Sequence, residues 1–221
     1  QESPERLRAV TLARMPQSHA VTFKDKFEQH LAAFEHKASP EITKVFLCDG
    51  HRTLWNYADQ QECYDDYEKL IDFYHTEEHL SKAAEALFGK RNARAQAWYN
   101  RYRVKLLEQE DGVASIRRSM VYYSQTQRLS KSRQEALAKE QTFFRRNQHR
   151  MNYADFRARG LPIGSGPVEA ACKSIVKTRL CRSGMRWSRQ GGQRILDFRC
   201  YAKCDLWKEF WDAYKAIRKS A

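Results

Sequence analysis

Asp49 stands where a carboxylate could bind a metal ion. It directly follows the short apolar run 45–48, and Asp49-Gly50 closes that run as a turn dipeptide would. A run of this length predicts a buried strand, and in open α/β sheets ligands gather beyond the carboxyl ends of the strands. A carboxylate there is a suitable oxygen ligand for Mg²⁺. Asp-Gly is also an ordinary turn, so the local sequence leaves both interpretations open.

Glu169 is the second candidate, and it comes just after the glycine-rich loop 160–167. Pro167 is suited to the first position of a helix, which would place Glu169 near the helix N-terminus. Lys173 and Lys177 follow at four and eight residues, on one helical face that could hold a phosphate backbone. A plain first-turn Glu, favoured by the helix dipole and paired with Lys173, fits the same pattern.

Residues 75–79 spell H-x-x-E-H, the inverted zinc-peptidase pattern. His75 and His79 could bind one zinc ion from a shared helix face, with Glu78 as the base. However, His75 closes an apolar run that is expected to be a strand. A peptidase would also leave the basic second half of the chain without a purpose, so we rank this hypothesis third.

The cysteines and the glycine-rich loop match no other common motif. The pairs Cys172–Cys181 and Cys200–Cys204 lack the spacing of a zinc site, so we expect buried free thiols. The loop lacks the G-K-[ST] of a phosphate-binding loop and the spacing of a nucleophilic-serine elbow.

The net charge of +13 is unevenly distributed. Residues 1–89 carry 10 Lys/Arg against 16 Asp/Glu, whereas residues 90–160 carry 17 against 6 and residues 161–221 carry 13 against 5. An acidic front joined to a basic remainder indicates an acidic site that acts on a polyanion, and we expect contact with nucleic acid. A set of solvated, Arg-rich helices is the alternative.

The elements around the candidate residues are expected to include a βαβ unit. Two short apolar runs, 45–48 and 70–74, predict strands, and residues near 54–57 could form a helix between them. Apolar residues at spacings of four, four and three predict an amphipathic helix over 22–36. Residues 7–12 could form a further strand.

The remainder of the chain is expected to be helical. Residues 75–149 have apolar repeats at three and four, with helix breaks predicted at Gly112 and at 124–127. After the glycine-rich loop we expect further helices, broken near Gly191-Gly192 and near Cys204.

Composition narrows the class of protein. A hydrophobic fraction of 42% allows a sizeable core and argues against intrinsic disorder. No apolar run approaches 18 residues and no signal-peptide pattern opens the chain, so we expect neither a membrane span nor a signal peptide. The first residue is Gln and not Met, which favours a fragment or a processed piece.

Together these segments resemble bacterial insertion-sequence transposases of the ISKra type. The resemblance extends from about Leu7 to about Tyr214, with departures at His51 and Pro167, where small or aliphatic residues are expected. It rests on blocks that occur in the same order in that family: Asp49-Gly50 with Leu54-Trp55, residues 72–75 with Glu78-His79-Leu80, Phe88-Gly89, residues 162–173, and residues 182–188 with Gly191-Gly192.

The resemblance implies an α/β fold class, a partial RNase H-like fold with a large all-α insertion and a helical C-terminus, mostly helical overall. Residues 1–78 would be the first part of the RNase H-like core, without its first strand. Residues 79–160 would be a basic helical insertion, and residues 161–221 the final core helices with the catalytic Glu.

The same resemblance implies a DDE triad in which Asp49 is the second Asp and Glu169 the final Glu. Both would bind Mg²⁺, for which Mn²⁺ is a possible substitute. Asp72 and His75 would form the supporting (C/D)-x-x-H motif. The first Asp would lie upstream of the given residues, so this chain alone is expected to be an inactive part of the enzyme.

The implied reaction is Mg²⁺-dependent cleavage of DNA strands at transposon ends, followed by strand transfer into target DNA. The implied partners are DNA, the missing N-terminal region and a homodimer or higher synaptic assembly, in the bacterial cytoplasm and associated with the nucleoid. Trp187 could stack on a base or be a core residue. The residues assigned to DNA contact are Lys173, Lys177, Arg179, Arg182, Arg186, Trp187 and Arg189.

Two alternatives stay open. The first is a non-catalytic DNA-binding or regulatory protein derived from a transposase. The second is a resolvase or simple RNase H nuclease, although neither needs a long basic helical insertion.

Overall fold

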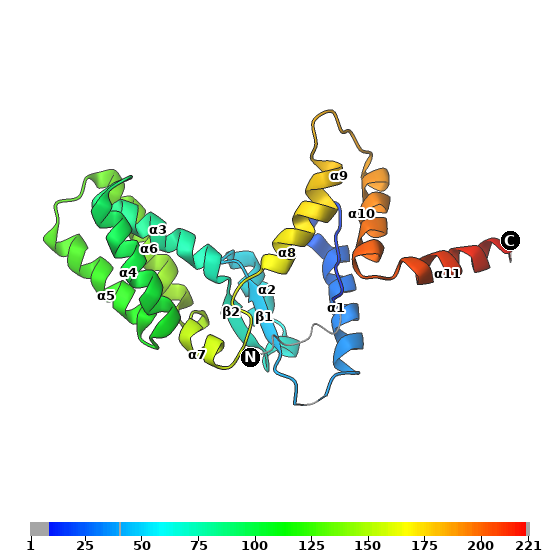
Figure 1. Cartoon of the computed structure of the whole chain (residues 1–221), viewed down its shortest axis with the longest axis horizontal. Coiled ribbons are helices and arrows are strands. Elements are labelled where there is room, and N and C mark those ends of the chain that lie inside the picture. Colours follow the sequence, from blue (N-terminus) through cyan, green and yellow to red (C-terminus); the bar gives the residue numbers. More distant parts are fainter. Residues whose placement is uncertain (1–8, 40, 220–221) are drawn as a thin grey trace. The chain divides into compact units, whose positions relative to one another are not determined.

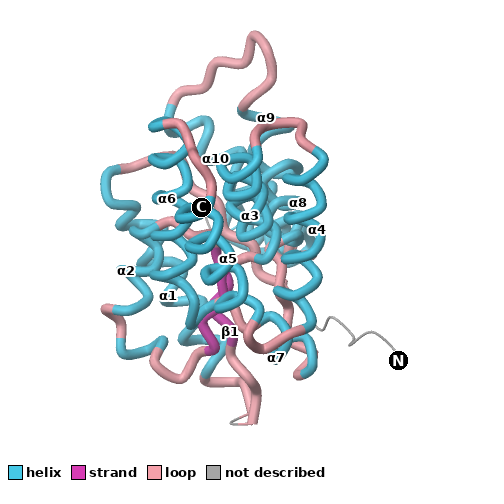
Figure 2. The backbone as a smooth tube through the Cα atoms, turned by 90° about the vertical axis from the view of Figure 1, so that its left-hand side faces the viewer, coloured by secondary structure: helices cyan, strands magenta, loops and turns pink. Residues whose placement is uncertain are grey.

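The computed structural model describes residues 9–39 and 41–219 and has two compact units. The central unit is Thr43–Ser165, and the terminal unit combines Gln1–Ile42 with Gly166–Ala221 (Figure 1). The described chain is mostly helical, with one two-stranded sheet (Figure 2). The expected domain boundary between residues 78 and 79 lies within a helix, α3 (Phe73–Phe88).

The predicted βαβ unit is present in the central unit. Strands β1 (Val45–Cys48) and β2 (Glu68–Ile71) pair in parallel, and α2 (Arg52–Asp59) lies between them in the sequence. The register pairs Cys48 with Ile71, so both strands end at one edge of the sheet. Asp49 and Asp72 therefore follow neighbouring strands at that edge.

The predicted strand 70–74 is wrong at its end, because Asp72 caps a helix. The Asp72 carboxylate accepts a hydrogen bond from the His75 backbone N–H at 2.9 Å, so Phe73 and Tyr74 already belong to α3. His75 therefore lies in the first turn of a helix and does not close a strand.

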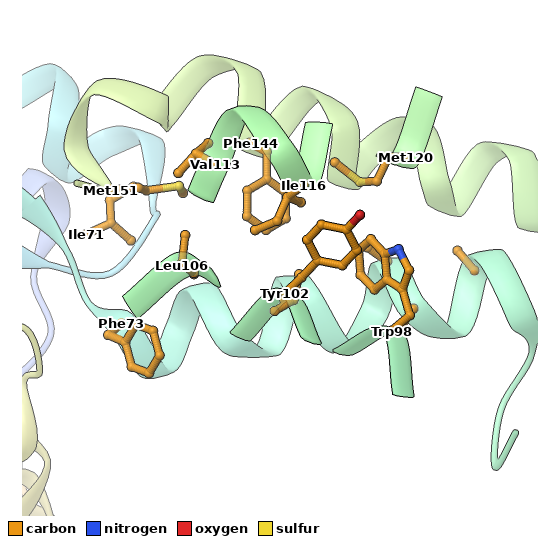
Figure 3. Close-up of a cluster of buried hydrophobic side chains, with 14 of the residues drawn as sticks. Ile71, Phe73, Trp98, Tyr102, Leu106, Val113, Ile116, Met120, Phe144 and Met151 are labelled. Atoms are coloured by element: carbon orange, nitrogen blue, oxygen red, sulfur yellow. The ribbon is translucent and has the colours of Figure 1, made fainter. Parts of the chain in front are cut away.

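The rest of the central unit is a helical bundle, as the apolar repeats over residues 75–149 predicted. Its helices surround one hydrophobic core, into which Leu106, Ile116 and Phe144 point (Figure 3). They are α3, α4 (Ala93–Glu108), α5 (Gly112–Thr126), α6 (Lys131–Asn147) and α7 (Tyr153–Ala158).

Several polar side chains inside this core are paired with one another or with the backbone. The Tyr153 hydroxyl donates to the Ile71 carbonyl at 2.9 Å and lies 2.7 Å from the Thr76 hydroxyl, which must then be the donor in that second bond. Trp98 Nε1 donates to Ser119 Oγ at 2.8 Å. These bonds offset the cost of burying the polar atoms. The two bonds of Tyr153 connect β2, α3 and α7, and the bond of Trp98 connects α4 and α5.

The helix breaks were predicted with mixed success. Gly112 is the first residue of α5, and a side chain there would lie 2.5 Å from the Lys105 carbonyl oxygen. Its lack of a side chain thus allows the close approach of α4 and α5. The second break comes after Thr126 and covers residues 127–130, at the edge of the predicted stretch.

The terminal unit is built from helices that follow a segment without regular structure. Residues 9–12 form no strand, and residues 7 and 8 of the predicted strand lie outside the described residues. This segment bonds to a side chain of the helix over residues 189–203, since the Met15 N–H donates to Gln193 Oε1 at 2.8 Å. The helices are α1 (Val21–Glu35), α8 (Gly166–Ala171), a π-helix (Cys172–Lys177), α9 (Thr178–Leu180), α10 (Arg189–Lys203) and α11 (Trp207–Lys219).

The predicted break at Gly191-Gly192 is wrong, because both glycines lie in the first turn of α10. The Ser188 hydroxyl caps the helix by accepting from the Gly191 N–H at 3.0 Å, and Gly192 packs against Met15. The break before α10 covers residues 181–188. The predicted break near Cys204 is confirmed, since α10 ends at Lys203.

The core of the terminal unit is small. Its cluster of buried residues consists of Ile175, Leu196 and Cys200, and α1 and α11 contribute no buried residue. Across the described ranges of both units, no helix combines the length and the apolar composition needed to cross a membrane.

Candidate functional site

Asp49 is exposed in the turn between β1 and α2. Its Oδ1 accepts from the His51 backbone N–H at 2.9 Å, and its carbonyl accepts from Trp55 Nε1 at 2.8 Å. These bonds make the turn that the Asp-Gly dipeptide predicted and fix it to α2. The carboxylate is thus held in place and still open to solvent, which suits a hard cation or another external partner.

Asp72 has a different environment at the same edge. It is only 3% exposed, and its carboxylate accepts backbone hydrogen bonds from His75 and from Ser165. The neighbouring Phe73 N–H donates to the Ile163 carbonyl at 2.8 Å. Asp72 therefore fastens the glycine-rich loop to the N-terminus of α3, a positioning role within the central unit.

Gly164 in this loop lies directly against the Tyr74 side chain. A side chain there would lie 2.8 Å from the Tyr74 ring. The loop therefore packs directly against the first turn of α3, which agrees with its hydrogen bonds to Asp72 and Phe73.

Gly50, at the turn after Asp49, also lies directly against aromatic side chains. A β-carbon at Gly50 would lie 2.6 Å from Cε2 of Phe143 and 3.3 Å from Nε2 of His75. The half-buried His75 ring therefore packs directly against the turn. The sequence predicted His75 near this edge. Nothing in the local sequence predicted that Phe143 on α6 contacts the turn at Gly50.

Of the H-x-x-E-H residues, Glu78 and His79 each have a protein partner. His79 Nδ1 lies 2.6 Å from Glu140 Oε2, and the exposed Glu78 is 3.8 Å from Lys82 Nζ. Among the residues that the structure describes, no three or more His, Cys, Asp or Glu are arranged to hold a metal ion. The geometry within the central unit thus gives the zinc-peptidase hypothesis no support.

Glu169 lies in the first turn of α8 in the terminal unit and is exposed. The ion pairs of the described residues do not include the predicted one between Glu169 and Lys173. Lys173 and Lys177 lie in the π-helix, whose wider turns change the faces that regular α-helical spacing predicted. The two lysines are exposed. The expectation that they share one face with Glu169 assumed α-helical spacing, which does not apply to a π-helix.

The other residues assigned to DNA contact are exposed as well. Trp187 is 42% exposed, and its Nε1 donates to the Arg179 carbonyl at 3.0 Å. Within the described part of the terminal unit it is therefore no core residue. The exposed cations around it are Arg179, Arg182, Arg186 and Arg189.

The cysteine prediction is half right. Cys200 and Cys204 are buried, but Cys172 and Cys181 are exposed. Burial, with a smaller contribution from Cys204, raises the pKa of Cys200 to about 11. In the central unit, burial and the charge of Asp49 raise the pKa of Cys48 to about 12.

Arg150 and Glu140 are the residues near this edge that sequence reasoning missed. Arg150 is buried, with its guanidinium 4.2 Å from the centre of the Trp55 ring and its Nη2 2.5 Å from Asp59 Oδ2. Burial raises the pKa of Asp59, but its hydrogen bonds and charge interactions with Arg150 and Lys69 outweigh this and lower the pKa. Arg150 thereby ties α2 to the bundle.

The arrangement can thus present one fixed, exposed carboxylate at a sheet edge, beside a packed histidine and a fastened loop. Glu140 and Arg150 belong to no motif, and only their contacts in the fold reveal them. No protein-family model, curated protein or solved structure matches this chain.

Proposed function

We propose that this chain is part of the catalytic region of a DDE transposase with an RNase H-like fold. Such an enzyme cleaves DNA strands at transposon ends and transfers them to target DNA. The observation that carries the proposal is the parallel βαβ unit, which ends in Asp49 and Asp72 at one edge and fastens the glycine-rich loop there.

The loop supports a catalytic role for Glu169 through chain connectivity. Ser165 is fastened to Asp72, and Glu169 follows Ser165 by four residues. Covalent geometry alone therefore keeps the Cα atoms of Ser165 and Glu169 within about 14 Å of each other.

Asp49 and Glu169 fit the implied metal by their chemistry, since both are exposed carboxylates and Mg²⁺ prefers oxygen ligands. Bound there, Mg²⁺ would stabilise the charge that develops on the attacked phosphate. In this proposal, the chain holds Asp49 in a rigid turn and keeps His75 against that turn.

The sheet leaves room for the remaining member of the triad. In the described residues β1 pairs only with β2, and the proposal adds a further parallel strand along the other side of β1. Parallel sheets normally have more than two strands, and helices cover both of their faces. We place the first catalytic Asp on a strand added there, at the same end of the sheet as Asp49.

The basic residues would hold the DNA. Exposed cations occur on the bundle helices as well as around Trp187, and each phosphate contact would release a counterion and make affinity fall with salt. Those on the bundle include Arg94, Arg101, Arg118, Arg128, Lys131, Lys139, Arg145 and Arg146.

The proposal is tested by replacing Glu169 in the full-length gene product. Glu169→Gln should abolish Mg²⁺-dependent cleavage of DNA that carries the element's ends, while salt-sensitive DNA binding persists. Glu209→Gln is the matched control, because Glu209 is also an exposed first-turn glutamate of a terminal-unit helix. Unchanged cleavage by Glu169→Gln, or an equal loss in the control, would remove Glu169 from the active site.

A second candidate function is a non-catalytic DNA-binding or regulatory protein of transposase origin. The observation that favours it is that Asp72 is buried and serves as a helix cap and loop anchor, whereas Asp49 is exposed. Salt-sensitive DNA binding without cleavage in the full-length product would select this alternative.

A further inference from the structure

A cluster of rings and one carboxylate lies between α3 and α6, beside the turn that carries Asp49. His79 Nδ1 on α3 is 2.6 Å from Glu140 Oε2 on α6. The His79 ring stacks on Phe143 with centroids 3.5 Å apart, and the His75 ring meets His79 edge-on at 5.0 Å. The cluster therefore joins two helices that are 61 residues apart at this contact.

Glu140 has a defined task in this cluster. It is 8% exposed, and a buried carboxylate is costly unless it is hydrogen-bonded. The bond to Nδ1 of His79 fixes the orientation of that ring, and in the neutral imidazole it also fixes the tautomer with the proton on Nδ1. Glu140 thus determines how His79 lies between Phe143 and His75.

The same rings reach the turn after Asp49. The position of a β-carbon at Gly50 is 3.3 Å from Nε2 of His75 and 2.6 Å from Cε2 of Phe143. Consequently the Nε2 edge of His75 lies against this turn, with His79 and Phe143 on its other sides. A shift of the His79 ring would free the His75 ring to turn.

We propose that Glu140 is a positioning residue that holds His79, and through it His75, so that Nε2 of His75 stays beside the Asp49 turn. This inference rests on the proposed function, because it assigns to α6 the orientation of a histidine in the proposed active site. Glu140 touches no reacting atom and acts through the two imidazole rings.

The competing explanation is that Glu140 merely fastens α6 to α3. Helix α3 contains a glutamate that can serve as a matched control. Glu77, also on α3, forms an ion pair with Arg103 of α4, in which the Glu77 side chain is 14% exposed and the Arg103 side chain 39% exposed. It is an acid that fastens a neighbouring bundle helix, as Glu140 is, but its partner is not in the ring cluster. Removing either carboxylate should weaken the bundle, whereas only Glu140 should affect His75.

The kinetic test uses Glu140→Ala, Glu140→Gln and Glu77→Ala in the full-length product. Glu140→Ala should lower kcat for DNA cleavage by about 10- to 100-fold at unchanged KM, as losses of orienting partners do. Glu140→Gln should recover most of kcat, because its amide oxygen can still accept from His79 Nδ1–H. Glu77→Ala should lower thermal stability but not kcat. Equal kcat in the two alanine variants, or no recovery in Glu140→Gln, would overturn the proposal.

A second readout needs no cleavage activity. In nuclear magnetic resonance spectra of the chain, Glu140→Ala should move the imidazole signals of both His79 and His75, whereas Glu77→Ala should leave them in place. Unmoved His75 signals in Glu140→Ala would overturn the positioning role by themselves. If the wild-type protein cleaves no DNA but the signals move as expected, the proposed function fails while the positioning of His75 holds.

Discussion

The two units of this chain differ sharply in how much hydrophobic surface they bury. In the described residues, the core of the central unit contains 22 buried hydrophobic residues, and that of the terminal unit contains three. The terminal unit also leaves aromatic side chains exposed, among them Trp207, Trp211 and Tyr214 on α11. An apolar groove of about 510 Å³ lies between α1, the residues before it and α8 with its π-helix.

The difference shows which parts of the proposed site are set by packing. Asp49 and His75 belong to the central unit, where a large core and side chains from α6 determine the geometry. Glu169 belongs to the terminal unit, where the small core determines much less. Burial contributes about 25 cal/mol per Å² of apolar surface, so the smaller core has less free energy to resist a local change.

The largest effect that tests this difference is expected from making the same cavity in both cores. Leu87→Ala in α3 should cost about 3–4 kcal/mol of unfolding free energy, since Leu87 is fully buried in the large core. Leu196→Ala in α10 should cost about 2 kcal/mol, because the open surroundings of the small core can collapse onto the space. Native-state hydrogen exchange in each unit measures both values, and an equal or larger loss for Leu196→Ala would contradict the comparison.

Two glycines in the first turns of α5 and α10 test the difference between the two cores with smaller expected effects. A β-carbon at Gly112 would lie 2.5 Å from the Lys105 carbonyl oxygen, so Gly112→Ala should cost about 2 kcal/mol through forced movement of backbone. At Gly192 the nearest atom is Met15 Sδ at 2.8 Å, in a flexible side chain that can move away. There the gain of about 1 kcal/mol in helix propensity should offset the clash. Urea unfolding of both variants checks the prediction, and an equal cost at the two sites would remove the distinction between rigid and yielding packing.

Thiol reactivity gives the smallest expected effect. At pH 8 the exposed Cys63, Cys172 and Cys181 should react with a thiol reagent first. Among the protected thiols, Cys48 should react more slowly than Cys200. The pKa of Cys48 is raised to about 12 and that of Cys200 to about 11, so Cys48 has the smaller fraction of thiolate.

Variants that retain one cysteine each, followed by mass spectrometry over time, would measure the order of labelling. Raising the pH should speed the labelling of both protected thiols, because each remains mostly protonated until the pH approaches its raised pKa. Faster labelling of Cys48 than of Cys200 at pH 8 would mean that the turn at Asp49 opens more readily than the small core.

Local patterns were sufficient to predict the elements that depend on neighbours in sequence. The apolar run 45–48 with its turn dipeptide predicted β1, and apolar spacing predicted α1 within one residue at each end. The end of β2 was missed because Asp72 acts as a cap, a role that its place after an apolar run did not reveal. The Gly191-Gly192 break failed because packing against Met15 depends on contacts distant in sequence.

The candidate site was predictable only in part, for the same physical reason. Asp49, Asp72 and His75 follow from the ends of two strands, so their neighbourhood could be expected from a βαβ unit. Glu140 could not, because its partner His79 is 61 residues away and no motif connects them. Regular helical spacing also could not reveal the π-helix that redirects Lys173 and Lys177.

The most direct test of the central claim is Mg²⁺-dependent cleavage of DNA carrying the element's ends by the full-length gene product. It should be measured for the wild type and for Asp49→Asn, with Asp65→Asn as the control for an exposed aspartate of the same unit. We expect cleavage by the wild type and the control, and none by Asp49→Asn, although all three bind DNA equally. Cleavage by Asp49→Asn at the wild-type rate would contradict the claim.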